Sequence, residues 1–85
     1  MSETQIVTFD ELDVDVLELT PDKESPVCGK PLSEVSFPKA SIVGVINHHG
    51  HLTIARGSSQ LTEEDTALVF AKNSVTETVR KLFIA

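Results

Sequence analysis

Alternating apolar and polar side chains predict a first strand over residues 14–19 (VDVLEL), where Val and Leu side chains alternate with acidic ones. The alternation changes phase at Val16 and Leu17, and we expect a β-bulge or a change of burial at this point.

The strongest strand pattern spans residues 41–47 (SIVGVIN). Strict alternation places Ile42, Gly44 and Ile46 on one face, and Val43 and Val45 on the other. Both faces are apolar, which is typical of a strand that is covered on both sides. We expect helices to cover one face, and a second copy of the chain is a candidate cover for the other.

A β-hairpin is predicted to follow this strand. Residues 48–50 (HHG) form the turn, in which Gly50 can adopt a positive φ. The return strand over 51–55 is expected to bury Leu52 and Ile54.

A short helical turn precedes the hairpin, and a further strand follows it. Residues 25–34 (SPVCGKPLSE) lead from small residues into a turn that Pro31 suits, because its missing N–H costs nothing there. Leu32 and Val35 are expected to face the core. Residues 66–71 (TALVFA) form the further strand.

The last element is predicted to be a helix. Ser74 and Glu77 have the S-x-x-E spacing of a capping box. The apolar stripe at helical spacing consists of Val75, Val79, Leu82 and Phe83. The element order is therefore strand, short helix, β-hairpin, strand, helix, which predicts a small α+β sandwich.

Composition and charge narrow the function. The chain has 85 residues, a net charge of −6 and one cysteine. The acidic side chains are concentrated before residue 25, so we divide the chain into an acidic lead or linker end (1–12) and a folded domain (13–85). No basic stripe is present for nucleic acid, and no apolar run approaches the roughly 18 residues that span a bilayer. We therefore expect a cytoplasmic domain without nucleic-acid binding or membrane insertion.

Catalytic and metal-binding patterns are weak. Cys28 is interpreted as a small buried hydrophobe. His48, His49 and His51 are interpreted as exposed turn residues, because structural zinc normally takes four ligands and no second cluster is present. Neither a nucleophile elbow nor a phosphate-binding glycine loop occurs, so we expect no enzyme activity and no resident cofactor or metal.

The chain resembles the TrkA C-terminal domain (RCK C-lobe) family. The resemblance covers residues 14–83, in four segments: Gly29-Lys30-x-Leu32-x-Glu34 with Val35; Phe37 to Ile46 with the turn glycine Gly50; Gln60-Leu61 with Asp65 to Phe70; and Val79 to Phe83. The chain departs from the family pattern at Asn47-His48, Ala55-Arg56 and Glu64-Asp65.

This resemblance implies a non-catalytic regulatory and dimerising domain of a Trk-type potassium uptake system. A Rossmann-type domain would precede it, a membrane transporter subunit would be its partner, and the dimer cleft would hold an effector, such as the nucleotide cyclic di-AMP in some relatives. For an effector in this chain, the expected contacts are Asn47, His48 and Arg56, with Ile46 as an apolar floor. Arg56 would bind a phosphate or carboxylate.

Three alternatives remain open. In the first, the domain is a purely structural dimerisation module without a ligand. In the second, the same domain is attached to a different transporter. In the third, the chain is a small protein that binds zinc through the histidine turn.

Overall fold

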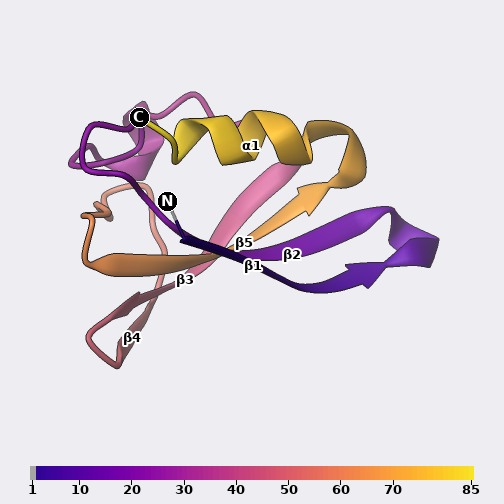
Figure 1. Cartoon of the computed structure of the whole chain (residues 1–85), viewed down its shortest axis with the longest axis horizontal. Coiled ribbons are helices and arrows are strands. Elements are labelled where there is room, and N and C mark those ends of the chain that lie inside the picture. Colours follow the sequence, from indigo (N-terminus) through magenta and orange to yellow (C-terminus); the bar gives the residue numbers. More distant parts are fainter. Residues whose placement is uncertain (1) are drawn as a thin grey trace.

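The computed structural model describes the backbone of residues 2–85, together with the side chains of Glu3 and of residues 11–85. Five antiparallel strands form one sheet in the order β1-β2-β5-β3-β4, and one helix lies across it (Figure 1). The elements are β1 (Ser2–Phe9), η1 (Asp10–Leu12), β2 (Val14–Thr20), η2 (Leu32–Glu34), β3 (Ser41–His48), β4 (His51–Ile54), β5 (Asp65–Lys72), η3 (Asn73–Val75) and α1 (Thr76–Leu82). The predicted α+β class and element order are confirmed, with β1 as an added strand.

The β3–β4 hairpin closes through a two-residue turn. His49 and Gly50 both have positive φ, 50° and 85°, which matches the type I′ turn preferred between twisted strands. The side-chain oxygen of Asn47 accepts a hydrogen bond from the Gly50 N–H at 2.8 Å. The predicted turn is therefore confirmed, and Asn47 stabilises it.

A β-bulge in β3 changes which residues share a face. The pairing with β5 shifts between Val43 and Val45, so Gly44 is the extra residue. Ile42 therefore lies on the same face as Val45, and Val43 lies with Ile46. The predicted strict alternation was wrong, because it did not include the bulge.

The N-terminal segment also differs from the prediction. We expected residues 1–12 to be a solvated acidic lead, but Ser2–Phe9 pairs with β2 as the edge strand β1. The register shifts between Gln5 and Val7, opposite Leu17 and Val16. The predicted irregularity thus lies in β1, while β2 itself buries Val16 and Leu17 on opposite faces.

The C-terminal helix packs on one face of the sheet. Val79 and Phe83 are fully buried, and Val75 and Leu82 pack against the same core, so the predicted stripe is confirmed. The predicted capping box was wrong. Residues 73–75 form the 3₁₀ turn η3, and neither η3 nor α1 has a side-chain cap hydrogen bond. Instead the buried Thr76 hydroxyl donates to the Asp15 carboxylate on β2 at 2.8 Å.

The two faces of the sheet differ sharply. The face under α1, here called the helix face, contributes buried core side chains: Leu17, Leu19, Ile46, Ala67, Val69 and Ala71. The opposite face, here called the open face, contains Ile42, Val45, Leu52, Ile54, Leu68 and Phe70. Leu52 is 64% exposed and Ile54 71%, so their predicted burial was wrong for the isolated chain. In the described part of the chain no helix packs on the open face (Figure 1).

Candidate functional site

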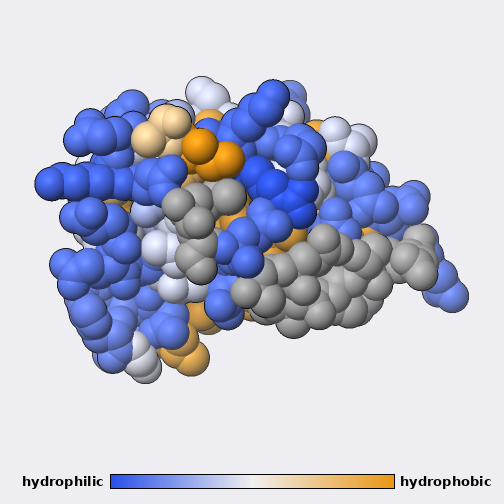
Figure 2. All heavy atoms as spheres, viewed as in Figure 1, coloured by the Kyte–Doolittle hydropathy of each residue, from blue (hydrophilic) through white to orange (hydrophobic). Residues whose placement is uncertain are grey.

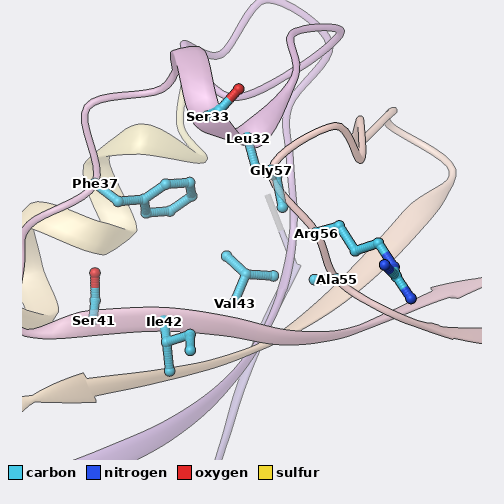
Figure 3. Close-up of a pocket in the computed structure, with 9 residues that line it drawn as sticks. All are labelled: Leu32, Ser33, Phe37, Ser41, Ile42, Val43, Ala55, Arg56 and Gly57. Atoms are coloured by element: carbon cyan, nitrogen blue, oxygen red, sulfur yellow. The ribbon is translucent and has the colours of Figure 1, made fainter.

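A cleft opens between η2, the start of β3 and the segment after β4 (Figure 3). Its volume is about 340 Å³. The lining residues are Leu32, Ser33, Phe37, Ser41, Ile42, Val43, Ala55, Arg56 and Gly57. The side chains of Leu32, Phe37 and Val43 converge on its centre, whereas Ile42 projects to the other side of β3 (Figure 3). The cleft is therefore apolar inside.

Backbone hydrogen bonds fix the two walls of the cleft to each other. The Leu32 N–H donates to the Ser59 carbonyl at 2.8 Å, and the Ser33 N–H donates to the Gly57 carbonyl at 2.9 Å. A Cβ at Gly57 would lie 3.3 Å from the Ser33 Cβ, so glycine permits this close approach. These contacts hold η2 against the loop that carries Arg56.

Arg56 lies at the rim of the cleft. Among the described lining residues it alone carries a charge, and its side chain extends outward from the apolar centre (Figure 3). Its backbone N–H donates to the Ser59 hydroxyl at 2.9 Å, which anchors the main chain at this point. A guanidinium in this position can bind a carboxylate or phosphate through two parallel hydrogen bonds.

The structure does not bring the four predicted ligand contacts into one cavity. Ile46 is only 6% exposed and belongs to the core on the helix face. Asn47 lies on the open face, where it lines a different hollow, and its oxygen is engaged by the turn. The imidazole of His48 contacts Asp65, so only Arg56 reaches the cleft.

The histidine turn is held to the start of β5 by two carboxylates. The Nδ1 of His48 contacts the Asp65 carboxylate, and the Nε2 of His49 lies 2.8 Å from the Glu64 carboxylate. Burial by itself would raise the pKa of Asp65, but hydrogen bonds from the Thr62 N–H, from His48 and from the Thr62 hydroxyl outweigh it and lower that pKa. Across the side chains that the structure describes, no three His, Cys, Asp or Glu residues lie close enough to hold one metal ion.

The residues that line the cleft were not predicted from the sequence as ligand contacts, apart from Arg56. Leu32 was expected only to face the core, and Phe37 and Val43 were read as parts of apolar segments. Their common position depends on pairing between segments far apart in the chain, such as the bridge between Pro31 and Gln60. Gly57 was a signal in the sequence that could have pointed to this cleft, because a glycine can mark a close approach between two backbone segments.

The fold and the site define a small α+β domain with an apolar cleft beside η2. A family model described as the TrkA-C domain matches residues 16–84, and the chain belongs to this family. The resemblance seen in the sequence is thereby confirmed.

The curated relatives that match this chain are named as proteins of the Trk potassium uptake system. A "Trk system potassium uptake protein TrkA homolog 2" from Methanosarcina mazei is 35% identical over 78 residues, which cover 92% of this chain and 17% of that protein. A "Trk system potassium uptake protein TrkA homolog" from Pyrococcus horikoshii is 33% identical over 69 residues, covering 80% of this chain and 30% of that protein. The chain thus spans less than a third of the length of these relatives. No helix in the described part of the chain is long and apolar enough to cross a membrane.

Proposed function

We propose that this chain is a non-catalytic regulatory domain of a potassium uptake system, acting at the cytoplasmic side of the membrane. The TrkA-C family match and the names of the relatives support this role. In this proposal the domain follows a Rossmann-type domain and regulates a membrane transporter subunit.

The effector would bind in the cleft beside η2. The observation that carries this part is the combination of an apolar cleft of about 340 Å³ with a single guanidinium at its rim. An effector with a flat apolar body and an anionic group matches both features, and a nucleotide such as cyclic di-AMP has this chemistry. Asn47 and His48, on the neighbouring hairpin, remain proposed secondary contacts, and Ile46 supports them from the core.

The domain would act as a homodimer, so that effector binding in the cleft changes how two subunits sit against one another. A coupling of this kind requires that the cleft and the dimer contact share residues or rigid elements.

An amide-resolved NMR titration with cyclic di-AMP, ATP, ADP and zinc tests the proposal. Saturable shifts at Leu32, Val43 and Arg56 with one nucleotide are the expected result. The change Arg56→Gln should weaken that binding about tenfold or more, because it removes a charge-assisted contact. Lys30→Gln is the matched control, since it removes the same charge from an exposed site outside the residues that line the cleft.

Other outcomes exclude parts of the proposal. Shifts confined to Asn47 and His48 would move the site to the hairpin, and zinc shifts at the histidine turn would favour a metal site. No response to any ligand, in a chain that still dimerises, would leave a structural dimerisation module.

A further inference from the structure

Both imidazole rings of the histidine turn contact a carboxylate where the chain enters β5. The Nδ1 of His48 contacts the Asp65 carboxylate, and the Nε2 of His49 lies 2.8 Å from the Glu64 carboxylate. Among the described side chains, no other ion pair or hydrogen bond involves either ring. The surface around this end of the hairpin, at the lower left of Figure 2, is mainly hydrophilic, and both imidazoles are more than half exposed. The rings can therefore exchange protons with the solvent while they lie against the carboxylates.

Asp65 is a fixed partner for His48. Its side chain is only 6% exposed, and its Oδ2 accepts hydrogen bonds from the Thr62 N–H at 2.9 Å and from the Thr62 hydroxyl at 3.2 Å. Burial alone would raise the pKa of Asp65, but the hydrogen bonds from Thr62 and His48 lower it. The carboxylate is therefore charged, and held in place, between about pH 5 and 8.

Protonation of the rings changes both contacts. A neutral imidazole carries a hydrogen on one of its two nitrogens, whereas a protonated imidazole carries one on each. The His48 contact needs the hydrogen on Nδ1 and the His49 contact needs it on Nε2, so a neutral ring donates in only one of its two tautomers. Histidine gains its second proton between about pH 8 and 5, and each ring then always donates and also places a positive charge beside a carboxylate. A falling pH therefore strengthens both contacts.

The charged groups around His48 come from every element beside it. Across the hairpin, His51 of β4 pairs with His48, and on the other side Asp65 of β5 pairs with it. His49 lies next to it in the turn, with the two ring centroids 4.4 Å apart, and Glu64 contacts His49. Protonated rings repel one another, whereas the two carboxylates attract them. Asp65 is the least exposed of these groups, so its attraction is the least screened by solvent and salt.

Strand β4 runs from the histidine turn directly into the wall of the cleft. It is the four-residue edge strand of the sheet, and all of its residues are exposed. Its end continues through Ala55, whose N–H donates to the Gly44 carbonyl at 2.9 Å, to Arg56 at the rim of the cleft. A short strand with so little burial opens locally at low cost, so the contacts at its turn contribute much of its local stability. The way the turn is held therefore affects the position of Arg56.

We infer that His48 and His49 form a pH-sensitive switch, which holds the β3–β4 hairpin against the start of β5 more firmly as the pH falls from about 8 to 5.5. The contact between His48 and Asp65 provides most of the effect, because an exposed pair such as His49 and Glu64 is worth little. The consequence for the cleft rests on the proposed function: effector binding there becomes pH-dependent through the position of Arg56. The domain would then respond to the acidity of its surroundings as well as to its effector.

Urea unfolding of the 85-residue chain at about pH 5.5 and about pH 7.5 tests the switch. The folding equilibrium constant of the original chain should be about three- to fivefold larger at the lower pH, a ratio here called the pH ratio. His48→Gln should remove most of the pH ratio, because glutamine keeps a donor but cannot gain a charge. His51→Gln is the matched control. His51 has no ion pair with a described carboxylate, and its removal takes away a like charge opposite His48, so the pH ratio should stay the same or increase.

Amide NMR shifts test the link between the switch and the cleft. Over the same pH range, the amides of Ala55 and Arg56 should shift in the original chain and stay fixed in His48→Gln. They should also stay fixed in Asp65→Asn, because asparagine keeps an acceptor but carries no charge. Shifts in the original chain that stop at Ile54 would overturn the link to the cleft.

The failures of the switch and of the proposed function are distinguishable. An equal pH ratio in the original chain and in His48→Gln, or a pH ratio that only His51→Gln removes, overturns the switch and leaves the effector titration unaffected. A pH ratio below one would show that repulsion among the rings outweighs the carboxylates, and it would overturn the direction of the switch. Failure of every effector to bind overturns the sensing role, while the pH ratio, which needs no effector, still decides the switch.

Discussion

The two faces of the sheet differ in how far their apolar side chains are buried. On the helix face, the side chains of Leu17, Leu19 and Val69 are completely buried, and α1 adds Val79 and Phe83. On the open face, Ile42, Leu52 and Ile54 remain more than half exposed.

The difference shows where this small domain obtains its stability. A chain of 85 residues buries about 60–65% of the surface that its unfolded form exposes, so a single covered face must supply most of the core. Substitutions on the helix face should therefore change the free energy of unfolding, whereas substitutions on the open face should mainly change association.

The largest expected effect comes from Phe83→Ala. Phe83 is fully buried and packs against Phe37, with ring centroids 6.4 Å apart. Its truncation should lower the free energy of unfolding by about 3–5 kcal/mol, because a large cavity remains in the core. Urea unfolding at low protein concentration measures this. Ile42→Ala on the open face is the matched control and should cost about 0.5 kcal/mol. Equal losses for the two variants would contradict the distinction between the faces.

A smaller loss is expected for Thr76→Val. The buried Thr76 hydroxyl donates to the Asp15 carboxylate and so ties α1 to β2 across the helix face. Its removal should cost about 2 kcal/mol, since hydrogen bonds to charged groups are stronger than neutral ones. Thr78→Val, at an exposed position of the same helix, should change stability by less than about 0.5 kcal/mol. A loss of equal size at Thr78 would show that helix propensity, and not the hydrogen bond, sets the effect.

Acid sensitivity is expected from Asp65, where the histidine turn meets β5. Because the pKa of Asp65 is lowered in the folded chain, its contribution to stability is present above the unfolded value of about 3.9 and is lost as the pH falls through the folded value. Asp65→Asn should therefore lower the urea midpoint at pH 5–7, and the difference from the original chain should shrink below about pH 4. Glu63→Gln, an exposed neighbour, is the control. A difference that stays constant down to pH 2 would contradict the role of the charge.

Much of the fold was predictable from local pattern. Residues 66–71 and the stripe that ends at Phe83 have strong periodicity, and both were placed correctly. β1 was not predicted because an edge strand needs only backbone pairing, and the segment SETQIVTF lacks a clean alternation beside its acidic neighbours. The bulge at Gly44 was not predicted because glycine has no side chain that would show the change of face.

The candidate site was less predictable than the fold. Arg56 was proposed as a contact through the family resemblance, but Leu32 and Phe37 come to the cleft through pairing between η2 and the loop after β4. Contacts of that kind depend on tertiary packing, which no local periodicity encodes. Ile46 shares the helix face with Val43, because the bulge at Gly44 reverses the alternation before it.

The smallest expected effect tests how freely the open face can adjust. A Cβ at Gly44 would lie 3.1 Å from Cε1 of Phe70, so Gly44→Ala requires the ring to move by a few tenths of an ångström. Because no described helix packs over Phe70, the ring can move, and the lower entropy of the unfolded chain offsets the strain. The free energy of unfolding should change by less than about 0.5 kcal/mol, measured by urea unfolding at low protein concentration. Ala67→Val, which adds carbon to the buried helix face, should cost about 1–3 kcal/mol. A loss above about 1.5 kcal/mol for Gly44→Ala would mean that Phe70 is held as firmly as a core residue, and the two faces would then differ in exposure but not in rigidity.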